Sequence, residues 1–254
     1  MEDVVFAFRF FTNIPFPGEN LWRERQAARA LGWLPLTGLV IGLVQAAMYL
    51  FMAYWGFPRG EAARSVLLIL TELFLGGTLF LDGFSDCCDG LFSRRDREGA
   101  LRIMKDSRIG AMGVVGLILY FLLKFAFYQE LGGGQEDFFR VLVYSPALAR
   151  FAVSLTACLF PAAKEEGLAS FFKKEQQPGD LLLAAVFAAA LGLWLPGYLR
   201  LAGLLALAGA YGTGALINRR LAGHTGDTYG FVSLVSEQMF LFFAALIGFV
   251  RWMY

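Results

Sequence analysis

Residues 65–90 read SVLLILTELFLGGTLFLDGFSDCCDG, an apolar run that ends in three aspartates. Glu72 is the one acidic residue in the run before them, and a run of this kind is typical of a helix that spans a membrane. Asp82, Asp86 and Asp89 follow at positions i, i+4 and i+7, which places them on one face if the piece is helical. Adjacent carboxylates at the end of a membrane span are unfavourable unless water or cations surround them, so this stretch predicts a functional site.

The composition of the whole chain indicates a membrane protein. Of its 254 residues, 57% are hydrophobic and 17% are charged, and the mean hydropathy is +0.57. A water-soluble domain of this size could not keep so much apolar surface away from water. The formal net charge of +1 gives no indication of a nucleic-acid partner. The three cysteines, an odd number, favour free thiols, and the single histidine excludes a histidine-rich metal site.

Apolar runs predict an all-α, polytopic membrane helix bundle that forms a single domain, residues 1–254. The predicted spans are about residues 34–55, 65–81, 112–131, 138–160, 181–195, 198–217 and 231–252. The fifth and sixth could instead form a re-entrant hairpin, so we expect six to seven transmembrane helices. Residues 1–33 form an amphipathic segment with a short interfacial helix, broken by the proline-containing stretch 13–18. The two conspicuous polar loops are residues 82–110 and 218–230.

The distribution of basic residues predicts the orientation of the bundle. Most of the 22 Lys and Arg residues fall in the N-terminal segment, in the loop 82–110, between residues 164 and 174, and at Arg219 and Arg220. With seven spans, these segments share one side of the membrane. Because short cytoplasmic loops are enriched in Lys and Arg, we expect the N-terminus and both polar loops on the cytoplasmic side of a prokaryotic inner membrane.

The aspartates of the first loop are candidate ligands of a divalent metal. Carboxylate oxygens suit Mg²⁺ or Mn²⁺, which hold phosphate groups by shared coordination. A basic cluster follows, and a pyrophosphate substrate requires both a metal and such cations. We expect Lys105 and Arg108, on either side of Asp106, to contact that substrate, whereas Arg94 and Arg95 reflect the cytoplasmic charge bias. The plainer alternative is a solvated loop in which the aspartates cap helices.

A second constellation lies at residues 224–230, which read HTGDTYG. Gly226 and Gly230 flank Asp227, and this pattern predicts a tight loop that presents one carboxylate as a further metal ligand or as a general base. The alternative is an ordinary turn in which the aspartate bonds to nearby backbone. We expect His224 to be a surface residue rather than a ligand.

Three ionisable side chains fall inside predicted spans: Lys124, Arg150 and Glu237. Residues of this kind at membrane depth pair, face a cavity, or do both. A Lys124–Glu237 pair and an Arg150–Glu237 pair are both compatible with the sequence. Cys87 and Cys88 have no histidine or cysteine partner at zinc-ligand spacing, so we expect them to be small packing residues.

Two classes of function fit these features. The first is a metal-dependent transferase that acts on a pyrophosphate-linked substrate at the membrane surface, where metal and cations neutralise the leaving group. The second is a transporter or channel for a divalent cation. The enzyme is favoured because the acidic residues gather at one side of the membrane rather than near the midplane, where transport sites lie, and because the same loops carry anion-binding charge.

The motifs resemble those of the cobalamin synthase family, the adenosylcobinamide-GDP ribazoletransferases, also called cobalamin-5′-phosphate synthases. The resemblance is carried by LDGFSDCCDGL at residues 81–91 together with IMKDSRIG at residues 103–110, a combination that is highly specific. FFTNIP at 10–15, KEEGL at 164–168 and TGDT at 225–228 match further motifs, so the resemblance extends over almost the whole chain.

This resemblance implies a reaction. A hydroxyl of α-ribazole, or of its 5′-phosphate, attacks GDP-activated adenosylcobinamide with the help of Mg²⁺, which forms adenosylcobalamin, or its 5′-phosphate, and releases GMP. The implied metal ligands are Asp82, Asp86, Asp89 and Asp227. Asp106 and Asp227 are the alternatives for a further ligand or a base. The implied substrate-binding residues are Arg102, Lys105, Ser107, Arg108 and Thr228, with Lys105 and Arg108 on the pyrophosphate.

The chain departs from the family at Phe80, where members often carry a histidine, and this makes an all-carboxylate site the expectation here. The CDP-alcohol phosphatidyltransferases, which also hold a metal with aspartates near a membrane face, are a poorer match because Gly110 stands where their motif needs an acid. The aromatic N-terminal segment reads as an interfacial anchor, with a shelf for the corrin ring as the alternative. The sequence leaves a homo-oligomer open.

Overall fold

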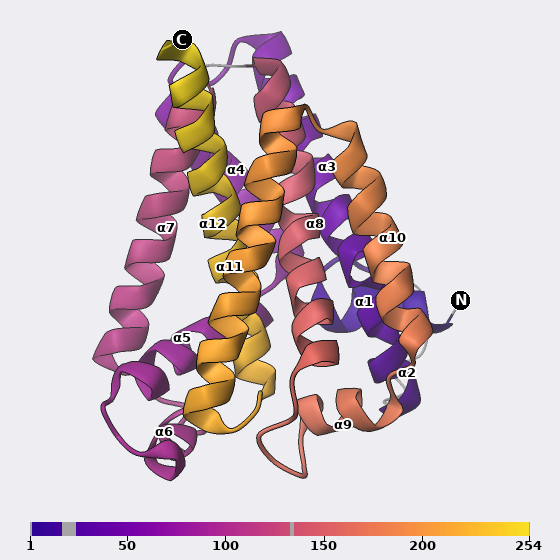
Figure 1. Ribbon diagram of the computed structural model, residues 1–254. Coiled ribbons are helices and arrows are strands. Elements are labelled where there is room, and N and C mark those ends of the chain that lie inside the picture. Colours follow the sequence, from indigo (N-terminus) through magenta and orange to yellow (C-terminus); the bar gives the residue numbers. More distant parts are fainter. Residues whose placement is uncertain (1, 17–23, 133–134, 254) are drawn as a thin grey trace.

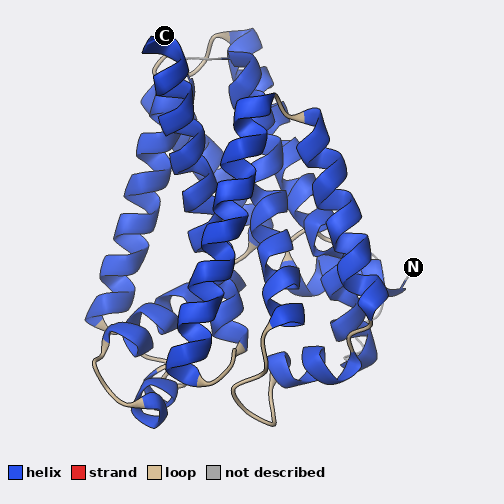
Figure 2. Cartoon of the chain, viewed as in Figure 1, coloured by secondary structure: helices blue, strands red, loops and turns tan. Residues whose placement is uncertain are grey.

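The computed structural model describes residues 2–16, 24–132 and 135–253. In these ranges the chain is a bundle of helices without strands, and one isolated parallel bridge joins Ala162 to His224 (Figures 1 and 2). The predicted all-α class is confirmed. The helices are, in order, α1 (Glu2–Phe11), α2 (Glu24–Arg29), the short 3₁₀ helix η1 (Ala30–Trp33), α3 (Leu34–Trp55), α4 (Glu61–Gly76), α5 (Leu79–Phe92), α6 (Arg97–Ile103), α7 (Ala111–Gly132), α8 (Gln135–Leu159), α9 (Leu168–Glu175), α10 (Pro178–Trp194), α11 (Gly197–Leu221) and α12 (Gly226–Met253).

Long apolar helices make this a multi-pass membrane protein. Among the described residues, five helices are long and apolar enough to cross a membrane, and up to seven spans result if each of two bent helix pairs counts as one. The predicted six to seven spans fall within this range. Large apolar side chains, such as Leu122 on α7 and Leu204 on α11, face outward. Such a surface is stable against lipid rather than against water.

The core of the bundle is built around α8. Leu142 and Leu148 on this helix are fully buried, and they share one apolar cluster with Leu199 of α11 and Leu241 of α12. Figure 1 shows α5, α6 and α9 together at one end of the bundle. The motifs that the sequence singles out lie on and between these short helices, so the long helices serve as the scaffold of that end.

The stretch 82–110, expected as a loop, is largely helical. α4 ends at Gly76, and α5 begins two residues after Gly77 with its axis bent by 97° from that of α4. Gly77 adopts a φ of +70°, which glycine tolerates and other residues rarely do. The prediction of an uninterrupted span over 65–81 is therefore wrong in its last part, because the chain turns at these glycines. The three aspartates lie on α5, on the far side of the turn.

The second loop, expected over 218–230, is shorter than predicted. α11 and α12 extend into it from both sides, and residues 222–225 connect them. Ala222 and Gly223 have φ values of 54° and 138°, and these left-handed conformations reverse the chain within a few residues. Asp227 consequently lies in the first turn of α12 rather than in a loop.

The N-terminal segment, residues 1–33, contains the predicted short helix as α1. This helix ends at Phe11, directly before the predicted break at 13–18. The last two residues of that break lie outside the described residues. Ala7, Phe8 and Phe11 of α1 are buried, so this helix packs onto the bundle with one face.

The ionisable side chains predicted inside spans are buried between helices. The ammonium of Lys124 lies 3.0 Å from a carboxylate oxygen of Glu237 and 2.6 Å from one of Glu72. The hydroxyl of Tyr120 donates to the second oxygen of Glu237 at 2.7 Å. The structure thus contains the first of the two predicted pairs, and Glu72 on α4 is an additional partner.

Arg150 makes different contacts. Its guanidinium donates to the hydroxyl of Ser233 at 3.1 Å and lies over the ring of Phe80, 3.9 Å from the ring centroid. Cys87 and Cys88 on α5 are buried, as predicted for small packing residues. The interior of the bundle therefore holds polar side chains, and their contacts join α4, α7, α8 and α12.

Candidate active site

α5 and α12 cross in close contact at the end of the bundle that carries the motifs. A Cβ atom at Gly83 would lie 2.8 Å from the Cα of Asp227, and one at Gly230 would lie 2.7 Å from the carbonyl oxygen of Phe80. Side chains at these two positions would push the helices apart. The glycines therefore let the first constellation meet the second, and Asp227 comes to lie beside the aspartates of α5.

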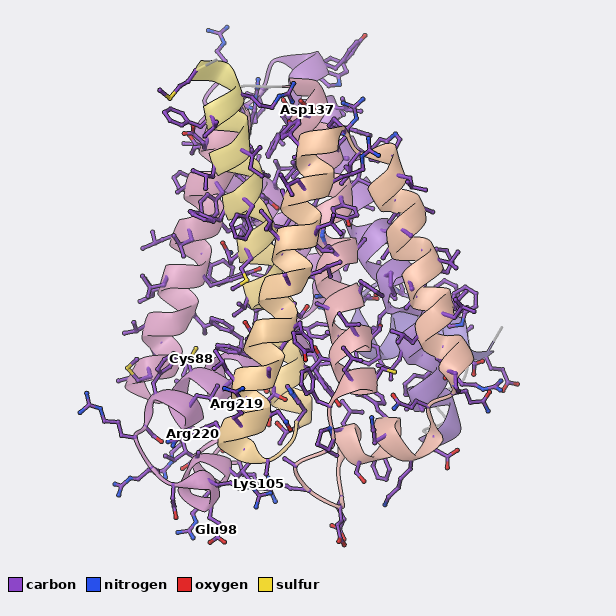
Figure 3. The ribbon with its side chains drawn as sticks, viewed as in Figure 1. Cys88, Glu98, Lys105, Asp137, Arg219 and Arg220 are labelled. Carbon is purple, nitrogen blue, oxygen red and sulfur yellow. The ribbon has the colours of Figure 1, made fainter. Side chains whose placement is uncertain are left out.

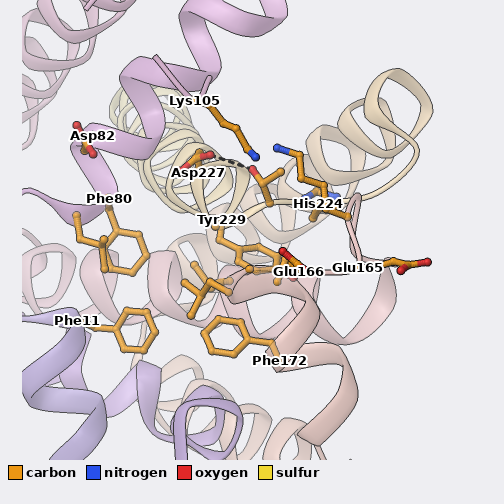
Figure 4. Close-up of a pocket in the computed structure, with 18 residues that line it drawn as sticks. Phe11, Phe80, Asp82, Lys105, Glu165, Glu166, Phe172, His224, Asp227 and Tyr229 are labelled. Atoms are coloured by element: carbon orange, nitrogen blue, oxygen red, sulfur yellow. Dashed lines mark hydrogen bonds between the residues drawn. The ribbon is translucent and has the colours of Figure 1, made fainter. Parts of the chain in front are cut away.

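A cavity of about 680 Å³ opens beside this crossing (Figure 4). Its charged lining includes Asp82, Asp227, Lys105 and Lys164. Figure 4 shows the side chain of Lys105 directed toward the region of Asp227. The structure thus brings together two predicted metal ligands and one predicted substrate-binding residue from distant parts of the sequence. The volume is typical of a site for a small molecule or a cofactor.

Aromatic rings line the other side of this cavity (Figure 4). Phe11 and Phe80 stack with ring centroids 5.8 Å apart, and Phe172 and Tyr229 stack with centroids 5.9 Å apart. Phe11 belongs to α1, so the N-terminal helix supplies part of the cavity lining. A cavity with one charged side and one aromatic side suits a ligand that carries both phosphate groups and a planar ring.

The turn before α12 orients the Asp227 carboxylate. The Thr225 hydroxyl donates to Asp227 at 3.2 Å, and the Thr228 hydroxyl donates to the Thr225 carbonyl at 2.9 Å. Thr228 is buried, and its role in substrate binding stays a prediction.

His224, in the same turn, corrects our expectation of a surface residue, because it is only 1% exposed. Its ring nitrogens lie 2.9 Å from the Thr228 hydroxyl and 3.1 Å from the carbonyl oxygen of Gly214. Burial lowers the pKa of His224 to about 4, so the ring is neutral at physiological pH. The histidine therefore serves to hold the turn between α11 and α12.

The carboxylates at the crossing have the right chemistry for a hard divalent cation. Asp86 is half-buried, and the charges that act on it are those of Asp82, Asp227 and Asp89. In the described parts of the chain, no three His, Cys, Asp or Glu side chains are close enough to hold a metal ion. Mg²⁺ is commonly bound by one or two carboxylates together with substrate phosphates. These residues fit Mg²⁺ in that shared form, as ligands that a phosphate-bearing substrate would complete.

Asp89 has a different environment from the other aspartates of α5. Its carboxylate accepts hydrogen bonds from the backbone N–H of Gly110 at 2.6 Å and of Gly113 at 2.8 Å. These groups lie at the start of α7, where backbone N–H groups lack partners within the helix. Asp89 therefore caps α7, as in the plainer alternative that the sequence allowed, and its role as a metal ligand stays a prediction.

The motif after α6 lies mostly outside the cavity. Arg108 and Asp106 form an exposed ion pair of 2.8 Å, and hydrogen bonds from Arg108 lower the pKa of Asp106 to about 2. Arg102 and Ser107 are exposed. Lys105 is the member of this group that lines the cavity. Contacts of the other residues with substrate stay predictions.

Lys164 and Phe172 are among the cavity-lining residues to which sequence reasoning assigned no role. Lys164 lies in the KEEGL motif, so the family match could have drawn attention to it. Phe172 on α9 carries no comparable signal, because it is one of 26 phenylalanines and only the packing of α9 shows where it points.

Comparisons with known proteins identify the family of the chain. The profile of the family described as Cobalamin-5-phosphate synthase matches residues 3–245. The adenosylcobinamide-GDP ribazoletransferase of Geotalea daltonii is 36% identical over 95% of this chain and 96% of its own. The proteins of that name from Roseiflexus sp. and Clostridium novyi are 37% and 33% identical, over 91% and 98% of this chain and 84% and 98% of theirs. No solved structure matches the chain. The chain belongs to the cobalamin-5-phosphate synthase family.

Proposed function

We propose that this protein is an adenosylcobinamide-GDP ribazoletransferase. It joins adenosylcobinamide-GDP to α-ribazole, or to α-ribazole 5′-phosphate, and releases GMP and adenosylcobalamin, or its 5′-phosphate. The family and the shared name of the relatives support this reaction. The observation that carries it to this chain is the cavity in which Asp82, Asp227 and Lys105 meet beside an aromatic wall.

The chemistry is a phosphoryl transfer. A bond forms between the ribazole hydroxyl oxygen and the phosphorus next to cobinamide, and the bond from that phosphorus to GMP breaks. We assign Asp227 as the base that takes the hydroxyl proton, because it lines the cavity and Thr225 orients it. Asp106, the alternative, is exposed and paired with Arg108. Lys105 binds phosphate oxygens and offsets the negative charge of the transition state.

Asp82 and Asp86 are the side chains that would hold Mg²⁺ together with substrate phosphate oxygens. The bound ion would supply neutralisation of the GMP leaving group. Their spacing of one helical turn on α5 supports this assignment, because it places both carboxylates on one face of the helix.

We place the active face in the cytoplasm and the bundle in the inner membrane. Figure 3 shows Lys105, Arg219 and Arg220 at the end of the bundle that holds the cavity, and Asp137 at the opposite end. The enrichment of Lys and Arg on the cytoplasmic side of membrane proteins supports this orientation.

Turnover by the purified protein tests the proposal. The protein in detergent is incubated with adenosylcobinamide-GDP and one of the two acceptors, in the presence of either Mg²⁺ or EDTA. GMP and the corrinoid product are then quantified by chromatography. We expect equal amounts of both products, and loss of both with EDTA or in Asp82→Asn. Glu98→Gln, an exposed acid on α6 at the same end, is the matched control and retains activity. A wild-type protein that releases no GMP would contradict the function, and turnover in EDTA would contradict the metal.

A further inference from the structure

Lys164, on the segment between α8 and α9, faces the same cavity as Lys105. Lys164 is half-buried and Lys105 is exposed at the cavity edge. The two residues are far apart in sequence, and they approach each other only because the segment before α9 folds back toward α6. Their ammonium groups therefore form a pair of like charges on one side of the site.

Carboxylates share the cavity with this pair, because Asp82, Asp227, Glu165 and Glu166 also line it. Burial is the main cause that lowers the pKa of Lys164, the charge of Lys105 lowers it further, and Asp227 opposes both effects in part. Neither lysine forms an ion pair within the described parts of the chain. Two ammonium groups that repel each other in a cavity favour an anion that contacts both.

The segment that carries Lys164 is firmly held. Arg97 on α6 donates to the carbonyl oxygen of Ala163 at 2.8 Å and to that of Leu221, the last residue of α11, at 2.7 Å. The backbone of His224 adds two bonds of 2.8 Å, one to Ala163 and one to Pro161. The segment, the start of α6 and the turn before α12 therefore form one unit. Lys164 directly follows Ala163 of this unit, and Lys105 lies just beyond the other end of α6, the helix that Arg97 ties to it.

We propose that Lys164 is a substrate-binding residue, and that Lys105 and Lys164 together hold the diphosphate of the GDP-activated donor. This inference rests on the proposed function. A diphosphate presents anionic oxygens on two neighbouring phosphorus atoms, so it can contact two cations at once. The pair also shares the cavity with Asp82 and Asp227, the proposed metal ligand and the proposed base. α-Ribazole 5′-phosphate carries the same chemistry in a single phosphate, and the experiment separates the two sources.

The experiment compares KM values for donor and acceptor in Lys164→Met, Lys164→Arg and Lys105→Met. Lys173→Met is the control, because Lys173 is an exposed lysine on α9 that does not line the cavity. We expect Lys164→Met to raise the KM for adenosylcobinamide-GDP by about 10- to 100-fold, the loss typical of one hydrogen bond to a charged group. The KM for α-ribazole should not change, and Lys164→Arg should retain most of the affinity. The double variant Lys105→Met/Lys164→Met should raise the donor KM by less than the product of the two single increases, because both lysines contact one group.

Binding of pyrophosphate provides a readout that does not require turnover. Titration calorimetry with wild-type protein should detect it, and Lys164→Met and Lys105→Met should each weaken it. An unchanged donor KM in Lys164→Met would overturn the inference, and so would a rise confined to α-ribazole 5′-phosphate. Should Lys164→Met fail to fold, Lys164→Gln and Lys105→Met carry the same comparison. If the wild-type protein is active and the Lys164 variants have the same donor KM, this inference alone is contradicted. If the wild-type protein is inactive, the proposed function is contradicted.

Discussion

Gly83 on α5 lies directly against the backbone of Asp227 on α12. A Cβ atom at position 83 would be 2.8 Å from the Cα of Asp227, closer than two such carbons approach in folded proteins. The neighbouring atoms belong to backbone, so they cannot rotate away as the end of a side chain would. The position of the proposed base relative to Asp82 and Asp86 therefore depends on the absence of a side chain at residue 83.

Gly83→Ala should lower the rate of GMP release strongly and the stability of the bundle moderately. Relief of the contact requires α5 and α12 to separate, which moves Asp227 relative to the aspartates of α5. Overpacking of this kind costs about 1–3 kcal/mol of stability, and a displacement of about 1 Å at a reacting group can lower the rate about a hundredfold. The measurement is kcat for GMP release together with the melting temperature in detergent. Gly212→Ala on α11, where a Cβ would meet nothing within 4 Å, is the control and should lower neither quantity.

Asp89→Ala should act mainly on stability. The variant removes two hydrogen bonds to the start of α7 and a negative charge at a helix N-terminus. We expect a loss of about 0.5–2 kcal/mol, measured as a lower melting temperature. Asp82→Asn, about two turns away on the same helix, should keep the melting temperature and lose activity. If Asp89→Ala melts like the wild type but is inactive, Asp89 is a ligand rather than a cap.

Lys124→Met should strongly destabilise the bundle. It leaves the buried carboxylates of Glu72 and Glu237 without their cation. Removal of one partner of a buried ion pair costs about 3–5 kcal/mol. The double variant Lys124→Met/Glu72→Gln should recover part of this loss, because one uncompensated charge is gone. Thermal unfolding in detergent measures both, and equal melting temperatures of the single variant and the wild type would contradict the role of this ion pair.

The protein should lose stability as the pH falls below about 6.5, the usual pKa of histidine in an unfolded chain. Burial holds the pKa of His224 at about 4 in the folded state, so the unfolded state binds the proton more readily between these two values. The effect of His224 on the free energy of unfolding is close to zero above pH 7 and reaches about 2 kcal/mol of destabilisation at pH 5. His224→Gln should therefore show a smaller drop in melting temperature between pH 7.5 and pH 5. An equal drop in melting temperature in the wild type and in His224→Gln would show that other titratable groups cause it.

The long helices were the part of the fold that the sequence predicted best. The boundaries of α3, residues 34–55, agree with the prediction, because Pro35 stands at its start and Gly56 ends it in a left-handed conformation. The span over 65–81 was misjudged because its hydropathy continues through Gly77, and only the backbone conformation of that glycine turns the chain. Hydropathy reports which residues avoid water, and it does not report where an apolar helix bends.

The site was predictable in its residue types and less so in its geometry. The spacing of Asp82 and Asp86 on one helical face followed from the pattern, and so did the presence of Asp227 on the same side. The capping role of Asp89 did not, because it depends on the position of Gly110 and the start of α7, which come from tertiary packing. Lys164 enters the cavity through contacts of Arg97, which no periodicity in the sequence encodes.

The ion pairs of Lys124 also have a consequence for how the protein is made. α7 carries its lysine into the membrane after α4 has supplied Glu72 but long before α12 supplies Glu237. A lysine at the centre of a membrane helix costs about 2.5–3.5 kcal/mol during insertion by the translocon. α4 and α7 therefore have reason to enter as a pair during synthesis, and their association stays incomplete until the last helix emerges from the ribosome. A chain that stops before α12 would lack Glu237, the second partner of Lys124, and Ser233, the hydrogen-bond acceptor of Arg150, so both buried cations would lose a contact.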